Sequence, residues 1–259
     1  MTATAIDTAP LLAGSELWNL LAIALADPFH GDRLARLADP ALRARAVAAA
    51  RLYADEAADD ERGPGERSGR DLDVEPLFRA FDQERDGLEV AYRAVFGLTV
   101  ATSCPPCETE FEVNDEVTYR SQRMADVGGF YRAFGLEPDA SRGERLDHLT
   151  LEAEFYAQVA AREALAREAG DDEASAICAD ARRSFFKEHL GWWTAPFAAL
   201  LDQQSASPFY REVAGCCAAL VCAERQQLGL PPFSILPQPR PTGDEPDESC
   251  DMCHSGGDE

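Results

Sequence analysis

Two Cys-x-x-Cys pairs are the residues whose types and spacing most directly suggest chemistry in this chain. Cys104 and Cys107 form the first pair, Cys250 and Cys253 form the second, and His254 follows directly. Cysteines at this spacing can present two thiolates to one metal ion from a single turn. The four cysteines together could therefore hold zinc or an iron–sulfur cluster, with His254 as a further ligand.

Other interpretations of the same pairs stay open. The second pair with its histidine has the spacing of a c-type haem attachment site, but that chemistry requires export from the cytoplasm. The first pair has the spacing of a dithiol oxidoreductase, but no βαβ pattern surrounds it. Reduced thiols without a ligand are the simplest state. A metal-binding or thiol redox-sensing protein is thus one hypothesis for the function.

The other cysteines of the eight in the chain lie in apolar, alanine-rich segments: Cys178, Cys216, Cys217 and Cys222. Eight cysteines in a chain of 259 residues do not make a disulfide scaffold, and the cytosol would keep them reduced. We expect these four to be small core residues.

A second constellation lies at the predicted start of a helix, where backbone N–H groups are free to bind a ligand. It consists of Asp147 and His148, preceded by Glu144 and Arg145. Asp147 could orient His148, or both could present polar groups to a ligand. The plainer alternative is an aspartate that caps the helix, with a solvent-facing histidine beside it.

A proline-rich segment upstream, residues 105–111, forms the third feature and is called the Pro-Pro loop below. Pro105 and Pro106 stiffen it, and Phe111 offers an apolar anchor. Tyr92 and Phe96 lie one turn apart on the preceding predicted helix. They either line a groove beside this loop or belong to the core.

Together these segments resemble the TorD/DmsD/NarJ family of cytoplasmic chaperones for molybdenum oxidoreductases of the DMSO-reductase type. Where Cys107 stands, family members commonly have an aromatic residue. The segments that carry the resemblance are residues 105–111, 126–131, 144–148 and 154–156.

The resemblance implies a protein that is not an enzyme and requires no cofactor. It would bind the twin-arginine leader or the apo form of a molybdopterin oxidoreductase catalytic subunit, and hold back export until the cofactor is inserted. Asp147 and His148 are expected beside the Pro-Pro loop, at the exposed edge of this surface, so that replacing Asp147 should spare the fold. The implied client-binding residues are Asp147, His148, Glu144, Pro106, Glu108, Phe111, Tyr92 and Phe96.

Charge excludes several other kinds of partner. The chain has 24 basic and 47 acidic residues and a formal net charge of −23. Such an excess disfavours nucleic acid and anionic membrane surfaces and favours cationic partners. No cationic region precedes the apolar run from Leu17 to Ala26, and no run is long enough to span a bilayer, so we expect a cytoplasmic protein without membrane insertion.

Hydrophobic residues make up 46% of the chain and recur with the helical period throughout. The sequence therefore predicts an all-α, single-domain bundle of about eight or more helices over residues 15–230, after a flexible segment 1–14. Ser15 is predicted to cap the first helix, and Asp39, followed by Pro40, to cap a helix ending near Ala57. Residues 231–259 are expected to form a disordered, Pro-rich, acidic tail. The other predicted helices span residues 74–86, 87–96, 114–134, 146–169, 172–189, 196–203 and 208–228.

No motif for nucleotide binding is present, neither a P-loop nor a G-x-G-x-x-G after a strand. Gly128 and Gly129 fall inside a predicted helix, where they would permit close packing. No nucleophile, base and orienting group form a defensible catalytic set.

Overall fold

A computed structural model of the chain describes residues 7–29, 31–58, 61–97, 104–112, 117–139, 143–234 and 237–239. Within these ranges the protein is built from helices and contains no β-strand, which confirms the predicted all-α fold. The α-helices are α1 (Ala9–Leu25), α2 (Arg33–Leu37), α3 (Pro40–Glu56), α4 (Glu75–Glu84), α5 (Leu88–Phe96), α6 (Val117–Ala133), α7 (Leu149–Ala169), α8 (Asp172–Phe185), α9 (Gly191–Gln204) and α10 (Pro208–Gln227). The described residues also form three short 3₁₀ turns and one π-helix: η1 (Gly69–Asp71), η2 (Arg85–Gly87), η3 (Glu108–Glu110) and the π-helix η5 (Phe186–Leu190).

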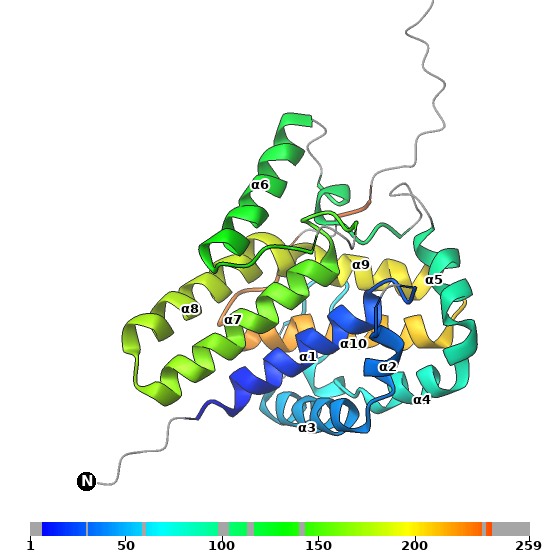
Figure 1. Ribbon diagram of the computed structural model, residues 1–259, viewed down its shortest axis with the longest axis horizontal. Helices are drawn as coiled ribbons and strands as arrows, with labels where there is room; N and C mark the ends of the chain where they lie inside the picture. The colour runs from blue at the N-terminus through cyan, green and yellow to red at the C-terminus, as the bar shows by residue number, and fades with distance from the viewer. Residues whose placement is uncertain are drawn as a thin grey trace, which may run out of the picture.

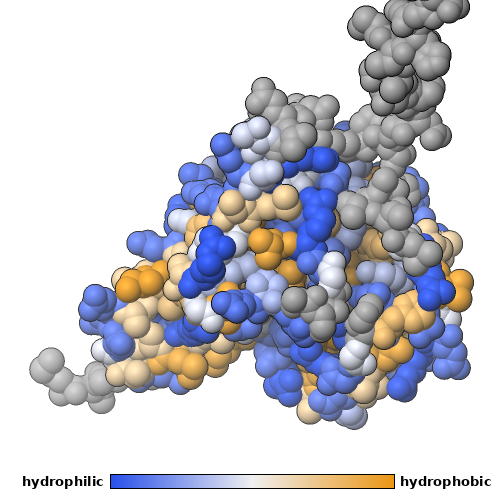
Figure 2. Space-filling view, turned by 45° about the horizontal axis from the view of Figure 1, so that its top comes forward, coloured by the Kyte–Doolittle hydropathy of each residue, from blue (hydrophilic) through white to orange (hydrophobic). Residues whose placement is uncertain are grey.

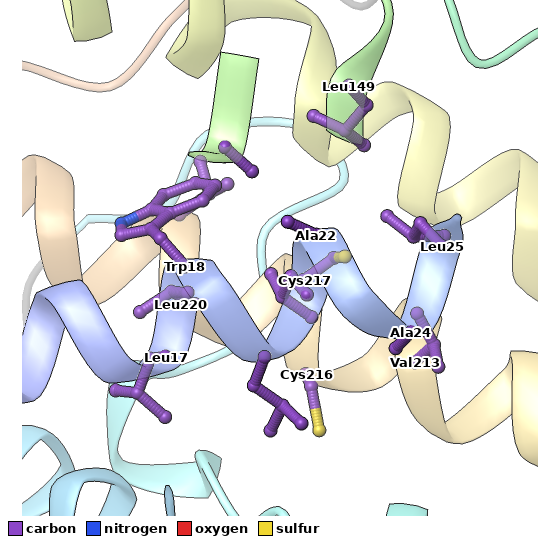
Figure 3. Close-up of a cluster of buried hydrophobic side chains, with 14 of the residues drawn as sticks. Leu17, Trp18, Ala22, Ala24, Leu25, Leu149, Val213, Cys216, Cys217 and Leu220 are labelled. Carbon is purple, nitrogen blue, oxygen red and sulfur yellow. The ribbon is translucent and has the colours of Figure 1, made fainter. Parts of the chain in front are cut away.

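The core forms around α1, which crosses the middle of the molecule and packs on α7, α3 and α10 (Figure 1). Side chains of α1 and α10 interdigitate there, with Trp18 and Cys217 completely buried and Leu149 of α7 closing one side (Figure 3). Because α1 is buried on most of its circumference, it is apolar almost throughout, as a central helix must be.

A buried carboxylate ties five helices together beneath this core. Glu224 of α10 accepts hydrogen bonds from Trp18 Nε1 at 3.3 Å, Tyr53 Oη at 2.8 Å, Tyr156 Oη at 2.6 Å and Arg182 Nη1 at 2.7 Å. A buried carboxylate is costly unless donors surround it. Four donors satisfy this one, so the cluster fixes how α1, α3, α7, α8 and α10 meet.

Several helix ends lie where the sequence predicted them. The Asp39 side chain accepts a hydrogen bond from the backbone N–H of Ala41 and caps α3. Gly135 follows α6 with φ of +67° and donates its N–H to the Arg132 carbonyl, as a C-terminal glycine does. The predicted cap of α6, Asn114, lies outside the described residues.

Several helix boundaries differ from the prediction, and α2 was not predicted. The first helix begins at Ala9, with Pro10 in its first turn, and Ser15 lies inside it, because proline already fits a helix start. The predicted helix over residues 172–189 ends at Phe185, and α9 continues from the π-helix through Pro196 as one element. The apolar pattern runs unbroken through this region, so it does not reveal the wider turn.

Part of the expected tail lies against the helical body. Phe233 packs against the core, and Leu230, directly before the expected tail, accepts a hydrogen bond from the Arg225 side chain through its carbonyl at 3.0 Å. Residues 240–259, with Cys250 and Cys253, lie outside the described residues. No helix in the described part of the chain is long and apolar enough to cross a membrane.

Candidate functional site

The Pro-Pro loop docks on the start of α7 through its backbone. The N–H of Glu108 donates to the Asp147 carbonyl at 2.9 Å, and the N–H of Leu149 donates to the Pro106 carbonyl at 2.9 Å. Cys107 and His148 thereby form an isolated antiparallel bridge. Two of the segments that carry the resemblance, residues 105–111 and 144–148, thus lie side by side, as expected, although they are far apart in the sequence.

The side chain of Asp147 holds this junction from the inside. Its Oδ2 accepts from the backbone N–H of Thr109 at 3.1 Å and from Thr109 Oγ1 at 2.7 Å. Arg145 donates two hydrogen bonds to the same carboxylate, from Nε to Oδ1 at 3.0 Å and from Nη2 to Oδ2 at 2.8 Å. Its Nη1 donates to Glu110 Oε1 at 2.6 Å. Burial alone would lower the pKa of the Arg145 guanidinium, but the charge of Asp147 and the hydrogen bonds to Glu110 and Asp147 together raise it above its ordinary value.

This arrangement corrects one expectation from the sequence. Asp147 was expected at the exposed edge of a binding surface, whereas its side chain is 0% exposed. An aspartate can be buried here because both oxygens accept charge-assisted or backbone hydrogen bonds. Asp147 therefore positions the Pro-Pro loop, and a ligand on the surface would meet the residues that it holds in place.

His148 is also buried, with an exposed fraction of 7%. Its Nδ1 accepts a hydrogen bond from the backbone N–H of Thr150 at 3.2 Å, so the histidine itself caps α7. The plainer alternative from the sequence, a capping Asp147 beside a solvent-facing His148, is therefore wrong.

Glu108 lies completely buried beneath the loop, where it meets α9 and the π-helix. Its Oε1 accepts from Trp192 Nε1 at 2.9 Å, and its Oε2 lies 3.2 Å from His189 Nδ1. Arg123 of α6 approaches the same carboxylate at 3.4 Å. Glu108 therefore links the loop to α6, the π-helix and α9, and it is not an exposed contact.

Glu152 is a second buried carboxyl group in this region. Burial raises its pKa well above the ordinary range, and the charges of Glu108 and Asp147 raise it further. The environment therefore favours the neutral form of this carboxyl group, and its Oε2 accepts from Trp193 Nε1 at 3.2 Å.

The predicted aromatic residues divide between core and surface. Phe111 is fully buried, with its ring centroid 5.4 Å from that of Trp193, and Phe96 packs 5.4 Å from Tyr210. Tyr92 is half-buried, and its pKa is raised first by burial and then by the carboxylates of Asp27 and Glu144. Phe96 and Phe111 are thus core residues, while the half-buried Tyr92, Glu144 and Pro106 reach the surface.

The described cysteines are buried thiols. Burial raises the pKa of Cys104 to about 12 and raises that of Cys107 well above its usual range. Protonated, buried thiols are poor nucleophiles and poor metal ligands. A shared site with Cys250 and Cys253 stays a prediction, because the second pair lies outside the described residues. The expected core cysteines at 178, 216, 217 and 222 are indeed buried.

Several residues of the site were not predicted from the sequence, among them Glu152, His189 and Trp192. Glu152 had a detectable signal, because it lies about one turn from Leu149 and Tyr156 on the apolar face of a helix. No sequence signal identifies His189 and Trp192, since only the fold brings them to Glu108.

A cleft of about 410 Å³ opens where the loop meets α6, α9 and the C-terminal segment. Its charged residues are Glu112, Arg123 and Lys187, and its apolar surface comes mainly from Trp192 and Phe233. Figure 2 shows one face of the molecule, which is largely hydrophilic with separate apolar patches. The remaining lining residues are Tyr119, Leu230, Pro231, Pro232, Ser234 and Pro237.

Comparison with known families identifies the class of protein. Residues 68–199, just over half of the chain, match the family described as nitrate reductase delta subunit. The chain therefore belongs to this family, whose members are maturation chaperones of the NarJ/TorD type for molybdoenzymes. The matched region includes the Pro-Pro loop and the start of α7. A search of curated proteins and of solved structures finds no match.

Proposed function

We propose that this protein binds the catalytic subunit of a molybdopterin oxidoreductase, through its leader or its apo form, before the cofactor is inserted. Binding would keep the client from twin-arginine export until insertion is complete. The observation that carries the proposal is the docking of the Pro-Pro loop on the start of α7, within the region that matches the family. No bond is made or broken in this function, which depends on affinity and timing in the cytoplasm.

The leader-binding surface would be the half-buried rim around this junction. Glu144 lies there, and Tyr92 lies close enough to Glu144 and Asp27 for their charges to raise its pKa. Carboxylates beside an aromatic ring suit the paired arginines of a leader, which can form charge-assisted hydrogen bonds and stack on the ring. The buried Asp147 and His148 would act indirectly, by holding the residues of the rim in place.

The cleft beside Trp192 would serve a different part of the client. Arg123 and Lys187 line it, so it disfavours an arginine pair. Its aromatic and proline residues would instead accept an apolar segment. The formal net charge of −23 would speed the encounter with a cationic leader as a whole.

A calorimetric titration tests the proposal. The probe is a synthetic peptide with the twin-arginine leader of a molybdopterin oxidoreductase from the same organism. We expect Glu144→Gln to weaken binding roughly tenfold, since one charge-assisted contact at a partly exposed site contributes ~1.4 kcal/mol. Glu137→Gln, which changes an exposed glutamate between α6 and α7, is the matched control and should bind as the wild type does.

A peptide with both arginines replaced by glutamine should bind weakly to every variant. Equal affinities of the wild type and Glu144→Gln would remove the rim from the proposal. Absence of binding by the wild type, together with no co-purification of the apo catalytic subunit, would remove the proposed function.

A further inference from the structure

We infer that Asp126, Glu188 and His189 form a binding site for a divalent transition-metal ion such as zinc. This site is separate from the leader-binding rim and does not depend on the proposed function. Asp126 lies on α6, and Glu188 and His189 lie on the π-helix η5. One ligand atom from each residue lies within 4.8 Å of the others.

The imidazole of His189 is the decisive element. It is 0% exposed, yet its Nε2 has no hydrogen-bond partner among the described residues. Asp126 Oδ2 lies 3.3 Å from Nε2 but is not aligned for a hydrogen bond. A buried polar atom without a partner is costly, and a bound cation would satisfy it.

The other nitrogen of the imidazole ring has the kind of partner that a metal-binding histidine has. Nδ1 of His189 lies 3.2 Å from Oε2 of Glu108. A hydrogen on Nδ1, donated to that carboxylate, would leave the Nε2 lone pair free for a metal ion. Trp192 donates to the other oxygen of Glu108 at 2.9 Å and so fixes the supporting carboxylate.

The spacing and the ligand types fit zinc or a similar ion. Two ligands of a tetrahedral ion with bonds of about 2.0–2.1 Å are separated by about 3.3 Å, and Nε2 of His189 and Oδ2 of Asp126 are 3.3 Å apart. The carboxylate of Glu188 needs only a side-chain rotation to close on the same point, because it is exposed. Water would complete the coordination.

The local charge also favours a cation. The three ligand residues are contacted by two further charged groups, Glu108 and Arg123, and Arg123 Nη1 donates to the Glu188 carbonyl at 3.1 Å. The carboxylates of Asp126, Glu188 and Glu108 and the guanidinium of Arg123 together carry a net charge of about −2. A divalent ion would balance this charge.

The wide turn that carries two of the ligands is itself specified by the sequence. The Gly191 N–H donates to the Phe186 carbonyl five residues earlier, and a Cβ at Gly191 would meet that carbonyl oxygen at 2.9 Å. Turns of this kind are rare and occur often at functional sites. Here the turn brings His189 against Glu108 and leaves Glu188 beside Asp126.

A bound ion would fasten α6 to the body of the protein. Figure 1 shows α6 projecting from the bundle, with its far end away from the other helices. Asp126 lies near the middle of α6, so a metal bridge to η5 would add to the contacts that Arg123, Phe130 and Tyr131 already make.

The test is a zinc titration of the full-length chain in a Cys250→Ser, Cys253→Ser background, which removes the tail thiols as competing ligands. We expect one zinc ion per chain and a higher Tm with zinc than without it. Asp126→Asn should lower the affinity at least tenfold through the loss of a ligand. Asp180→Asn, at an exposed position on α8, is the matched control and should bind as its parent does.

Cobalt serves as the spectroscopic probe of the same site. The cobalt complex of the serine background should show d–d bands without thiolate charge transfer, and Asp126→Asn should lose these bands. Asp126→Asn is the test variant because Asp126 is exposed, so its replacement spares the fold, whereas His189 is buried. Unchanged zinc affinity in Asp126→Asn, or no binding in the serine background, would overturn the proposal.

Discussion

Asp147→Asn is the change that most directly tests how the junction between the Pro-Pro loop and α7 is held. The substitution keeps the shape of the side chain but replaces one carboxylate oxygen with an amide N–H₂ group. Both oxygens accept hydrogen bonds in the structure, from Thr109 and from Arg145. In either orientation of the amide, its N–H₂ group faces a donor group of Thr109 or Arg145.

The magnitude follows from the burial of the two partners. Breaking a fully buried ion pair costs ~3–5 kcal/mol, but the Arg145 side chain is 27% exposed and keeps its contact with Glu110. We therefore expect a loss of about 2–3 kcal/mol in the free energy of unfolding. In a domain of this size, that lowers Tm by about 4–12 °C. The expectation that a change at Asp147 spares stability, drawn from the sequence, is thereby revised.

Guanidinium unfolding followed by circular dichroism measures the effect, with Asp180→Asn as the control for removal of an exposed aspartate. Arg145→Gln and the double variant complete a mutant cycle. The double variant should lose less than the sum of the two single variants, because both remove the same contact. A loss below about 0.5 kcal/mol for Asp147→Asn, or strict additivity in the cycle, would refute the role assigned to this carboxylate.

Two further predictions concern buried groups elsewhere. Folding favours the neutral form of Glu152, because burial raises the pKa of this carboxyl group well above its ordinary range. The group therefore contributes stability that is fully present below the pKa of an unfolded glutamate, ~4.3, and is lost as the pH rises through the raised folded pKa. Glu152→Gln should reduce the fall in Tm between mildly acidic and alkaline pH. Gly14→Ala should destabilise the protein despite a gain in helix propensity of ~0.5–1 kcal/mol, because the new Cβ would overlap the Tyr53 hydroxyl, whereas Gly129→Ala meets nothing within 4 Å and should raise Tm.

The helical architecture was predictable because its signals are local. The apolar period, the Asp39 cap and the terminal Gly135 each depend on neighbours within about one turn, and the structure contains all three. The start of α1 was misjudged because Ser15 and Pro10 both signal a helix start, and Pro10 lies closer to it. Where two local signals compete, the sequence alone does not rank them.

The candidate site was predictable only in part, because its chemistry depends on contacts between distant segments. The Pro-Pro loop and the start of α7 were found through their motifs, but motifs carry no information about burial. Asp147 and Phe111 were assigned to a surface and proved to be interior. His189 gave no signal in the sequence, since it acquires its partner Glu108 only when residues 81 positions apart meet.

Glu108 shows why variants at this site must be chosen by burial. Its backbone N–H holds the loop on α7, while its side chain holds His189 and Trp192 on two other elements. Replacing Glu108 would therefore disturb the loop, the inferred metal site and the cleft at once, and weakened client binding would not show contact with the client. Glu144 is half-buried and lies at the rim, so its replacement changes charge without opening the interior. A fall in leader affinity in Glu144→Gln with unchanged Tm is accordingly the result that identifies a contact, whereas a fall in both identifies a residue that positions others.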